Sequence, residues 1–289
     1  MALYSENTNS MAYSELRFSY RPRNVSRTLT DYALRQLLFR SFLLIAVCIV
    51  AVTIKPRMRD IPHEKLLYDY KHPRRVSTFS IWIMALLTIF EPLAIFWLLS
   101  KDFGDTVEVF LMWSLSISIT AAITEFLKLT VGRPRPDFYY RCFPDGVYIT
   151  NMQCTGNLRD IMDGRKSFPS GHTGLAFASL GMVSLFMYQR SIVLYEEQSR
   201  ASQLLFYSMP LMVASAIGVS RCIDNKHHWE DVLVGAIIGF STSCFCYCSD
   251  CNWCDVGYLP STPLVLRMSM GDSNRLPSGD SSARLPPIS

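Results

Sequence analysis

Charged residues are scarce in this chain of 289 residues: Asp, Glu, Lys and Arg together make up 18% of it. A soluble domain usually carries about 25%. Hydrophobic residues make up 49%, which excludes a chain that is disordered throughout. The net charge of +4 is too small for a face dense in basic side chains, so no nucleic-acid partner is expected. The composition therefore favours a membrane protein.

The sequence also lacks the regular cysteine spacing of small disulfide-rich proteins, although it contains nine cysteines. Cys251 and Cys254 form a CxxC pair with no nearby histidine, which argues against a zinc site. They belong to a cluster of five cysteines, Cys244, Cys246, Cys248, Cys251 and Cys254. These cysteines could be S-palmitoylation sites on the cytosolic side, or simply small apolar residues at the end of a spanning helix. Cys142 and Cys154 flank a polar stretch and could form a disulfide if it faces an oxidising compartment. The sequence leaves both questions open.

Long polar stretches are few, because six apolar segments fill most of the chain. They are Leu37–Ile54, Phe79–Leu99, Val107–Leu127, Thr173–Tyr188, Leu204–Val219 and Val232–Cys248. A spanning helix needs about 20 residues, so the last three segments require their flanking residues to complete a crossing. We therefore predict an all-α fold, a polytopic membrane protein with six transmembrane helices.

The pattern predicts three regions along the chain. Residues 1–36 are polar and basic and form an N-terminal tail, and residues 37–250 form the six-helix transmembrane domain. Residues 251–289 are rich in Ser, Pro and Gly, which predicts a disordered C-terminal tail.

Three polar patches stand at the ends of apolar segments. They read Lys-Leu-Thr-Val-Gly-Arg-Pro-Arg-Pro over 128–136, Lys-Ser-Phe-Pro-Ser-Gly-His-Thr over 166–173 and Ser-Arg-Cys-Ile-Asp-Asn-Lys-His-His-Trp-Glu-Asp over 220–231. With six crossings, all three patches fall on one side of the membrane and both chain ends on the other. A site at the membrane–water boundary requires such a convergence.

The patches carry groups that suit an anion. Lys128, Arg135 and Arg221 are cations at the ends of predicted helices, and an arginine fork with a lysine suits phosphate or another tetrahedral oxyanion. Ser170 and Gly171 open the fourth apolar segment, where the free N–H groups of a helix N-terminus bind anions.

The same patches carry groups that can attack and transfer protons. His227 and Asp231 are four residues apart and share a helical face, so the carboxylate can hold one ring nitrogen and leave the other free to attack. His172 is a second imidazole for proton transfer. A dedicated Mg²⁺ site would need several carboxylates, and the patches offer few. The residues therefore describe a metal-free phosphoryl-transfer site.

Each patch alone has a plainer explanation. Basic residues after a spanning helix often anchor it at the interface, Pro-Ser-Gly is also a turn signal, and a lone His–Asp pair is often structural. The presence of all three on one side favours the site. Glu125 lies in an apolar segment, and we expect it to pair with Lys128. His228 and Trp229 are expected to serve as packing and interfacial anchors.

The three patches resemble the tripartite signature of the lipid phosphate phosphatase superfamily, the type-2 phosphatidate phosphatases. That signature is Lys-x6-Arg-Pro, Pro-Ser-Gly-His and Ser-Arg-x5-His-x3-Asp, and every position is filled here in order. The resemblance covers roughly residues 30–250. The residues around the first and third patches are similar to the phosphatidate and diacylglycerol pyrophosphate phosphatase branch. The resemblance implies a phosphatase-type helical bundle that needs no metal or other cofactor.

The resemblance also implies a role for each signature residue. His227 would be the nucleophile that forms a phosphohistidine, and Asp231 would orient and polarise it. His172 would protonate the leaving lipid oxygen and then help water to hydrolyse the intermediate. The phosphate oxygens would be bound by Lys128, Arg135, Ser170, Gly171 and Arg221.

The implied activity is metal-independent hydrolysis of phosphatidate and related lipid phosphates, such as lysophosphatidate and diacylglycerol pyrophosphate, within the bilayer. The alternative is a catalytically silent membrane protein that binds lipid phosphates or scaffolds partners. The resemblance further implies a site facing the lumen or exterior of the endoplasmic reticulum or plasma membrane, with both chain ends cytosolic. Counting Lys and Arg does not decide this orientation. The sequon at Asn24 should then be unused, and the preferred lipid and a homo-oligomeric state stay open.

Overall fold

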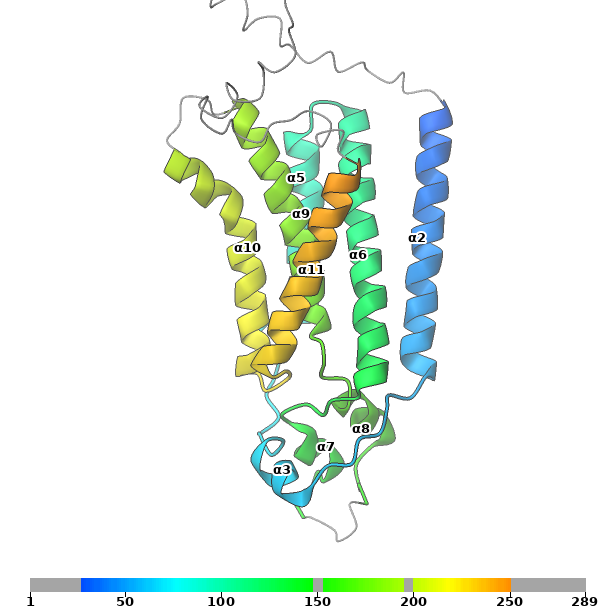
Figure 1. Cartoon of the computed structure of the whole chain (residues 1–289), viewed down its shortest axis with the longest axis vertical. Helices are drawn as coiled ribbons and strands as arrows, with labels where there is room; N and C mark the ends of the chain where they lie inside the picture. The colour runs from blue at the N-terminus through cyan, green and yellow to red at the C-terminus, as the bar shows by residue number, and fades with distance from the viewer. Residues whose placement is uncertain (1–26, 148–152, 195–199, 251–289) are drawn as a thin grey trace, which may run out of the picture. The chain divides into compact units, whose positions relative to one another are not determined.

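The computed structural model describes residues 27–147, 153–194 and 200–250, and all regular secondary structure in these ranges is helical (Figure 1). The long helices are α2 Arg27–Thr53, α6 Phe103–Val131, α9 Gly171–Leu194, α10 Arg200–Ile223 and α11 Trp229–Asp250. One further crossing is composed of α4 Ile81–Ala85, the π-helical segment η1 Leu86–Phe90 and α5 Glu91–Leu99. The short helices are α3 His63–Tyr68, α7 Phe138–Cys142 and α8 Leu158–Gly164. The predicted all-α class is confirmed.

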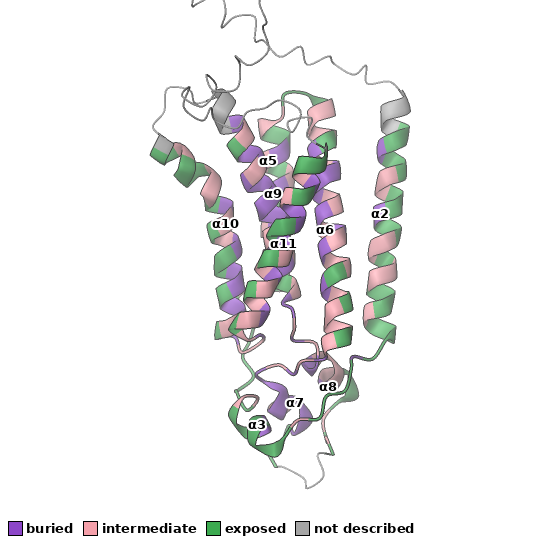
Figure 2. Cartoon of the chain, viewed as in Figure 1, coloured by how far each residue is buried: buried purple, intermediate pink, exposed green. Residues whose placement is uncertain are grey.

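Within the described ranges, five helices are long and apolar enough to cross a membrane. They cover Asp31–Thr53, Trp82–Leu99, Phe103–Val131, Ala201–Ile223 and Trp229–Ser249. Their outward faces carry exposed large apolar side chains such as Phe42 and Trp97, as the green faces in Figure 2 illustrate. Such surfaces require lipid around them. The protein is therefore an integral, multi-pass membrane protein.

The predicted sixth span corresponds to α9, which is not among these five helices. It lies in the interior of the bundle, where it packs against α5, α6, α10 and α11 at once. Ala176, Ala178 and Leu180 are fully buried there, and so is Ser179. A helix surrounded by protein needs no apolar surface for lipid. Its 24 residues extend about 36 Å, enough to cross a bilayer core.

Five of the six crossings extend beyond the apolar segments that predict them, whereas the crossing from α4 to α5 covers Ile81–Leu99 and lies inside its predicted segment. The last three gain flanking residues at both ends, as their short apolar cores require. At the N-terminal end, α2 begins at Arg27, before the predicted segment and inside the region assigned to a tail. At the other end, α11 ends at Asp250, and the tail predicted for 251–289 lies outside the described residues.

The backbones of α9 and α11 approach each other closely where glycines face them. A Cβ on Gly239 would lie 2.1 Å from the Gly174 carbonyl oxygen, and one on Gly235 would lie 2.6 Å from the Ser170 carbonyl oxygen. Only glycine permits this approach. Asp231 lies one helical turn before Gly235, and its carbonyl accepts a hydrogen bond from Ser170 N at 2.9 Å. Glycine packing therefore sets the second and third polar patches side by side.

The connections at one end of the bundle form a small cap. Figure 1 shows α3, α7 and α8 together below the ends of α6 and α11. Their shared apolar core includes Leu66, Phe138 and Phe143, all fully buried. A disulfide joins Cys142 to Cys154, which answers the question that the sequence left open. The described ends of α2 and α11 nearest the chain termini lie at the opposite end of the bundle, as predicted.

Candidate active site

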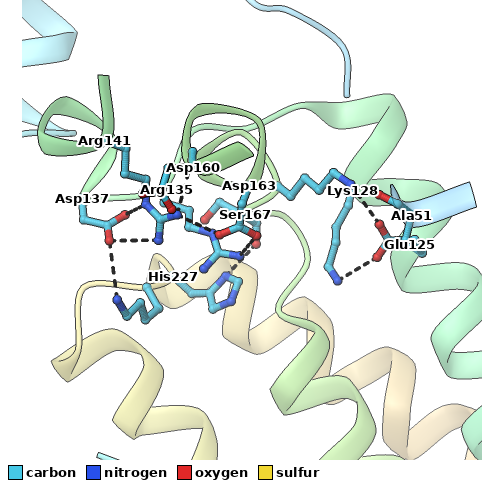
Figure 3. Close-up of polar contacts among 12 residues, drawn as sticks. Ala51, Glu125, Lys128, Arg135, Asp137, Arg141, Asp160, Asp163, Ser167 and His227 are labelled. Carbon is cyan, nitrogen blue, oxygen red and sulfur yellow. Dashed lines mark hydrogen bonds and ion pairs between the residues drawn. The ribbon is translucent and has the colours of Figure 1, made fainter. Parts of the chain in front are cut away.

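The three polar patches meet where the cap joins the bundle (Figure 3). The ring of His227 contacts the carbonyl of Ser167, and the carboxylate of Asp231 binds Arg133. The first patch reaches the second through a hydrogen bond from Ser167 N to Arg133 O at 3.0 Å. The predicted convergence is therefore confirmed in the geometry.

His227 is held in one orientation by a backbone carbonyl. It follows α10 in a buried loop, and its Nδ1 lies 2.7 Å from the carbonyl oxygen of Ser167. A carbonyl can only accept a hydrogen bond, so Nδ1 carries the hydrogen and Nε2 keeps a free lone pair. Burial, and next the charge of Arg135, hold the pKa of His227 well below its ordinary value. The ring is therefore neutral at physiological pH and its Nε2 can act as a nucleophile.

Asp231 does not form the expected direct hydrogen bond with His227, because its Oδ2 lies 4.0 Å from Nδ1. The fully buried carboxylate accepts hydrogen bonds from Ser167 Oγ at 2.5 Å and from Arg133 Nη1 at 2.7 Å. It also accepts from the backbone N–H of His228 at 3.0 Å and lies 3.2 Å from His228 Nδ1. Asp231 thus fixes Ser167, and Ser167 fixes His227, while the carboxylate remains close enough to stabilise positive charge on the ring.

His172 is the second residue of α9, and it is exposed. The charged groups that act most strongly on its ring are Arg221, Arg135 and Lys128, and then Asp163. An exposed imidazole at a helix N-terminus, with three cations within electrostatic reach, lies where a bound anion would lie. The structure thus places His172 where a proton could pass to such an anion.

Lys128 lies at the mouth of the α9 N-terminus. A Cβ on Gly171 would lie only 2.9 Å from Lys128 Nζ, so the ammonium group and the first turn of α9 are in contact. Lys128 pairs with Glu125 at 3.0 Å, which confirms that prediction. Gly132 ends α6 in the left-handed conformation at φ 58°, where a Cβ would lie 2.0 Å from Arg57 O. Glycine therefore stops the helix one turn after Lys128.

Arg135 and Arg221 each have one carboxylate partner. Arg135 Nη2 lies 3.0 Å from Asp163 Oδ1, and Arg135 Nε is buried with no hydrogen-bond partner among the described residues. Arg221 is 2% exposed, and its Nη2 lies 3.1 Å from Asp224 Oδ2. The carbonyl of Arg221 accepts hydrogen bonds from the backbone of Lys226 and His227. Arg221 therefore also shapes the loop that carries His227.

Ser170 takes part in the start of α9. Its hydroxyl accepts a hydrogen bond from Thr173 Oγ1 at 2.9 Å, and its N–H donates to Asp231 O. The hydroxyl therefore acts first as a helix cap. The N–H groups in the first turn of a helix have no partner within the helix, so those of Gly171 and His172 are suited to an anion.

The sequence of the chain matches the profile of the PAP2 superfamily over residues 110–252. It is 39% identical to lipid phosphate phosphatase 2 of Arabidopsis thaliana over 213 residues, which is 71% of this chain and 73% of that protein. The chain belongs to the PAP2 superfamily. Lipid phosphate phosphatase 1 of the same plant is 34% identical over 71% of this chain and 64% of its own length.

A further PAP2 relative is a probable diacylglycerol pyrophosphate phosphatase 1 of Schizosaccharomyces pombe. It is 35% identical over 46% of this chain and 50% of its own length. The matched PAP2 region contains all three patches but not α2, α4 or α5. Those helices and their connections support the site from outside, as when the Ala51 carbonyl of α2 accepts a hydrogen bond from Lys166.

Four residues around the PAP2 signature have roles that sequence reasoning missed. Ser167 acts through its carbonyl, which every residue possesses, so no signal marks it. Arg133 stands beside Arg135 in Gly-Arg-Pro-Arg-Pro, and this doubled arginine was the available signal. His228 packs edge-on against Tyr70, as expected, and also hydrogen-bonds to Asp231, whereas Trp229 is exposed at the start of α11. Asp163 lies in α8, six residues before the Pro-Ser-Gly-His motif, and is not itself a signature position.

Proposed function

We propose that this PAP2 protein is a phosphatase that hydrolyses the phosphomonoester of phosphatidate and related lipid phosphates, lysophosphatidate and diacylglycerol pyrophosphate among them. The observation that carries the proposal is the contact between His227 Nδ1 and the Ser167 carbonyl, which leaves Nε2 unprotonated within the electrostatic reach of Arg135. The names of the relatives, lipid phosphate phosphatases and a diacylglycerol pyrophosphate phosphatase, support the same substrate class.

In the first step, Nε2 of His227 attacks phosphorus while the bond from phosphorus to the lipid oxygen breaks. His172 donates its proton to that oxygen, so the lipid leaves as an alcohol. The ring of His227 becomes positively charged, because it keeps the hydrogen on Nδ1. The Ser167 carbonyl and the nearby Asp231 carboxylate stabilise that charge. A bound phosphate dianion offsets the three cations and so favours the protonated form of His172.

In the second step, water attacks the phosphohistidine. His172, now neutral, takes a proton from the water, and the bond between nitrogen and phosphorus breaks to release inorganic phosphate. Lys128, Arg135, Arg221 and the first turn of α9, with Ser170 and Gly171, balance the charge on the phosphoryl oxygens in both steps. These groups suffice for the chemistry, so the mechanism uses no metal.

The decisive experiment measures phosphate release from phosphatidate in detergent micelles containing EDTA. His227→Ala should lower the rate by at least about 10³-fold, because the covalent route is lost. His72→Ala is the matched control, since His72 is exposed and lies outside the site. Equal release by parent and His227→Ala would contradict the mechanism, as would release that requires added Mg²⁺. A parent that binds phosphatidate but releases nothing would support the silent alternative.

We further propose that the site faces the lumen or the exterior, with both chain ends in the cytosol. The disulfide between Cys142 and Cys154 supports this orientation, because disulfides persist in oxidising compartments. Asn24, which lies outside the described residues, provides the test. Glycosylation of Asn24 in cells would overturn the orientation, and its absence alongside glycosylation of a sequon engineered near Val147 would support it.

A further inference from the structure

Asp163 is a carboxylate that the proposed chemistry does not use, although it touches a phosphate-binding group. It lies on α8 in the insert between the first and second patches. Its Oδ1 lies 3.0 Å from Arg135 Nη2, and its Oδ2 lies 2.8 Å from Arg141 Nη1 (Figure 3). The arginine and α8 are also joined by a backbone hydrogen bond from Arg135 N to Gly164 O at 2.8 Å.

Arg141, the second partner of Asp163, is itself held in place by other residues. Arg141 makes two hydrogen bonds to Asp137, at 2.7 and 3.1 Å, and both side chains are buried. Lys226 lies 3.7 Å from the same carboxylate. Charges of alternating sign therefore follow one another in the order Lys226, Asp137, Arg141, Asp163 and Arg135. In this series, Asp163 is the carboxylate that contacts the phosphate-binding arginine.

Asp163 differs from its partners in exposure. The carboxylate side chain is 49% exposed, whereas Arg135 is 15% and Arg141 is 4% exposed. Although burial alone would raise the pKa of Asp163, Arg135 and Arg141 bring it below the usual value, so the group is charged. A carboxylate on an arginine fork forms the same kind of charge-assisted hydrogen bond as a phosphate oxygen.

We propose that Asp163 is the counter-ion of Arg135 that competes with phosphate for the guanidinium group and so weakens the hold of the site on released phosphate. This inference rests on the proposed function. A lipid substrate adds the binding of its acyl chains, which offsets the competition, whereas inorganic phosphate has no such contribution. The competition therefore weakens the binding of the product, inorganic phosphate, more than it weakens the binding of the lipid substrate.

The test uses the full chain in detergent and inorganic phosphate as the probe. Phosphate affinity is measured directly by calorimetry and separately as the inhibition constant against phosphatidate hydrolysis. Asp163→Asn keeps an oxygen that can accept from Arg135 but removes the charge, so phosphate should bind about tenfold more tightly. Asp163→Glu keeps the charge, and its phosphate affinity should stay within about threefold of the parent value.

Asp160→Asn is the matched control, because Asp160 lies on the same helix in an exposed pair with Arg74. It should leave phosphate affinity unchanged. Unchanged or weaker phosphate binding by Asp163→Asn would overturn the proposal, and so would equal tightening by Asp160→Asn. Thermal melting of each variant separates these results from misfolding, and Asp163→Ser removes the same charge if Asp163→Asn does not fold. Because calorimetry needs no turnover, a parent without hydrolase activity would contradict the proposed function and leave this result readable.

Discussion

His227 and Asp231 are buried and held by several fixed partners, whereas Arg135 is held by one exchangeable carboxylate, Asp163, which is half exposed. Asp231 is 0% exposed and accepts from three residues, while Asp163 is 49% exposed and pairs with two arginines. A nucleophile needs one orientation, and buried, satisfied networks give it. A phosphate-binding group must instead change partners in each cycle. One part of the site therefore positions the nucleophile, and the other part exchanges a carboxylate for phosphate in each cycle.

The largest effect that should sharpen this comparison is that of Asp231→Asn. An amide lacks the charge that supports the cationic ring in the intermediate, and its NH₂ group cannot accept from both Arg133 and Ser167. We expect kcat on phosphatidate to fall by about 10³-fold, with KM changed by less than about threefold. Steady-state kinetics on protein of unchanged melting temperature measure this. A large rise in KM at constant kcat would show that Asp231 contributes to substrate binding. The distinction between residues that position the nucleophile and residues that bind phosphate would then be lost.

A smaller effect is expected at Arg133, which positions Asp231 without touching the reacting atoms. Arg133→Gln keeps a donor for Asp231 Oδ1 but removes the charge, so kcat should fall by about 10- to 30-fold. Arg133→Lys, which restores the charge, should recover part of the loss. Arg74→Gln is the control, because its exposed ion pair with Asp160 contributes little. If Arg133→Gln raised KM alone, Arg133 would belong with the phosphate-binding residues.

The convergence of the site could be predicted from sequence because spanning helices leave few alternatives. Once six crossings are counted, the patches around Lys128, His172 and His227 must lie at one membrane face. The helix count itself was harder, since α9 packs against four other helices and is not among the five that length and apolar composition single out as spans. A helix largely surrounded by protein needs no apolar face for lipid.

The details of positioning could not be predicted, because they depend on backbone atoms and on the cap. The acceptor for His227 is the Ser167 carbonyl, a group that carries no side-chain signal. Asp163 reaches Arg135 only because α8 folds back over the first patch, and the spacing of a polar insert does not define such a fold. The disulfide between Cys142 and Cys154 depends on the same fold. Sequence therefore identifies the reacting groups better than the residues that hold them.

The smallest expected effect concerns pH. An imidazole with an ordinary pKa of about 6.5 would be mostly protonated at pH 5.5. Because only the neutral ring can attack, the rate would fall about tenfold. Burial, and next Arg135, lower the pKa of His227 well below that value, so its neutral form persists on acidification. We expect kcat/KM, corrected for the ionisation of the substrate phosphate, to change by less than about twofold between pH 7 and 5.5.

The comparison of the two parts of the site depends on this result. A profile of kcat/KM against pH for phosphatidate measures it, and the exposed His72→Ala variant should give the same profile as the parent. An acid limb near pH 6.5 that Asp231→Asn shifts would mean that His227 exchanges protons with solvent at its ordinary pKa. The buried network would then fail to hold the ring neutral. His227 would exchange with solvent, just as Arg135 exchanges its partner, and the contrast between the two parts of the site would be lost. A flat profile requires that burial around His227 acts on its chemistry as well as on its orientation.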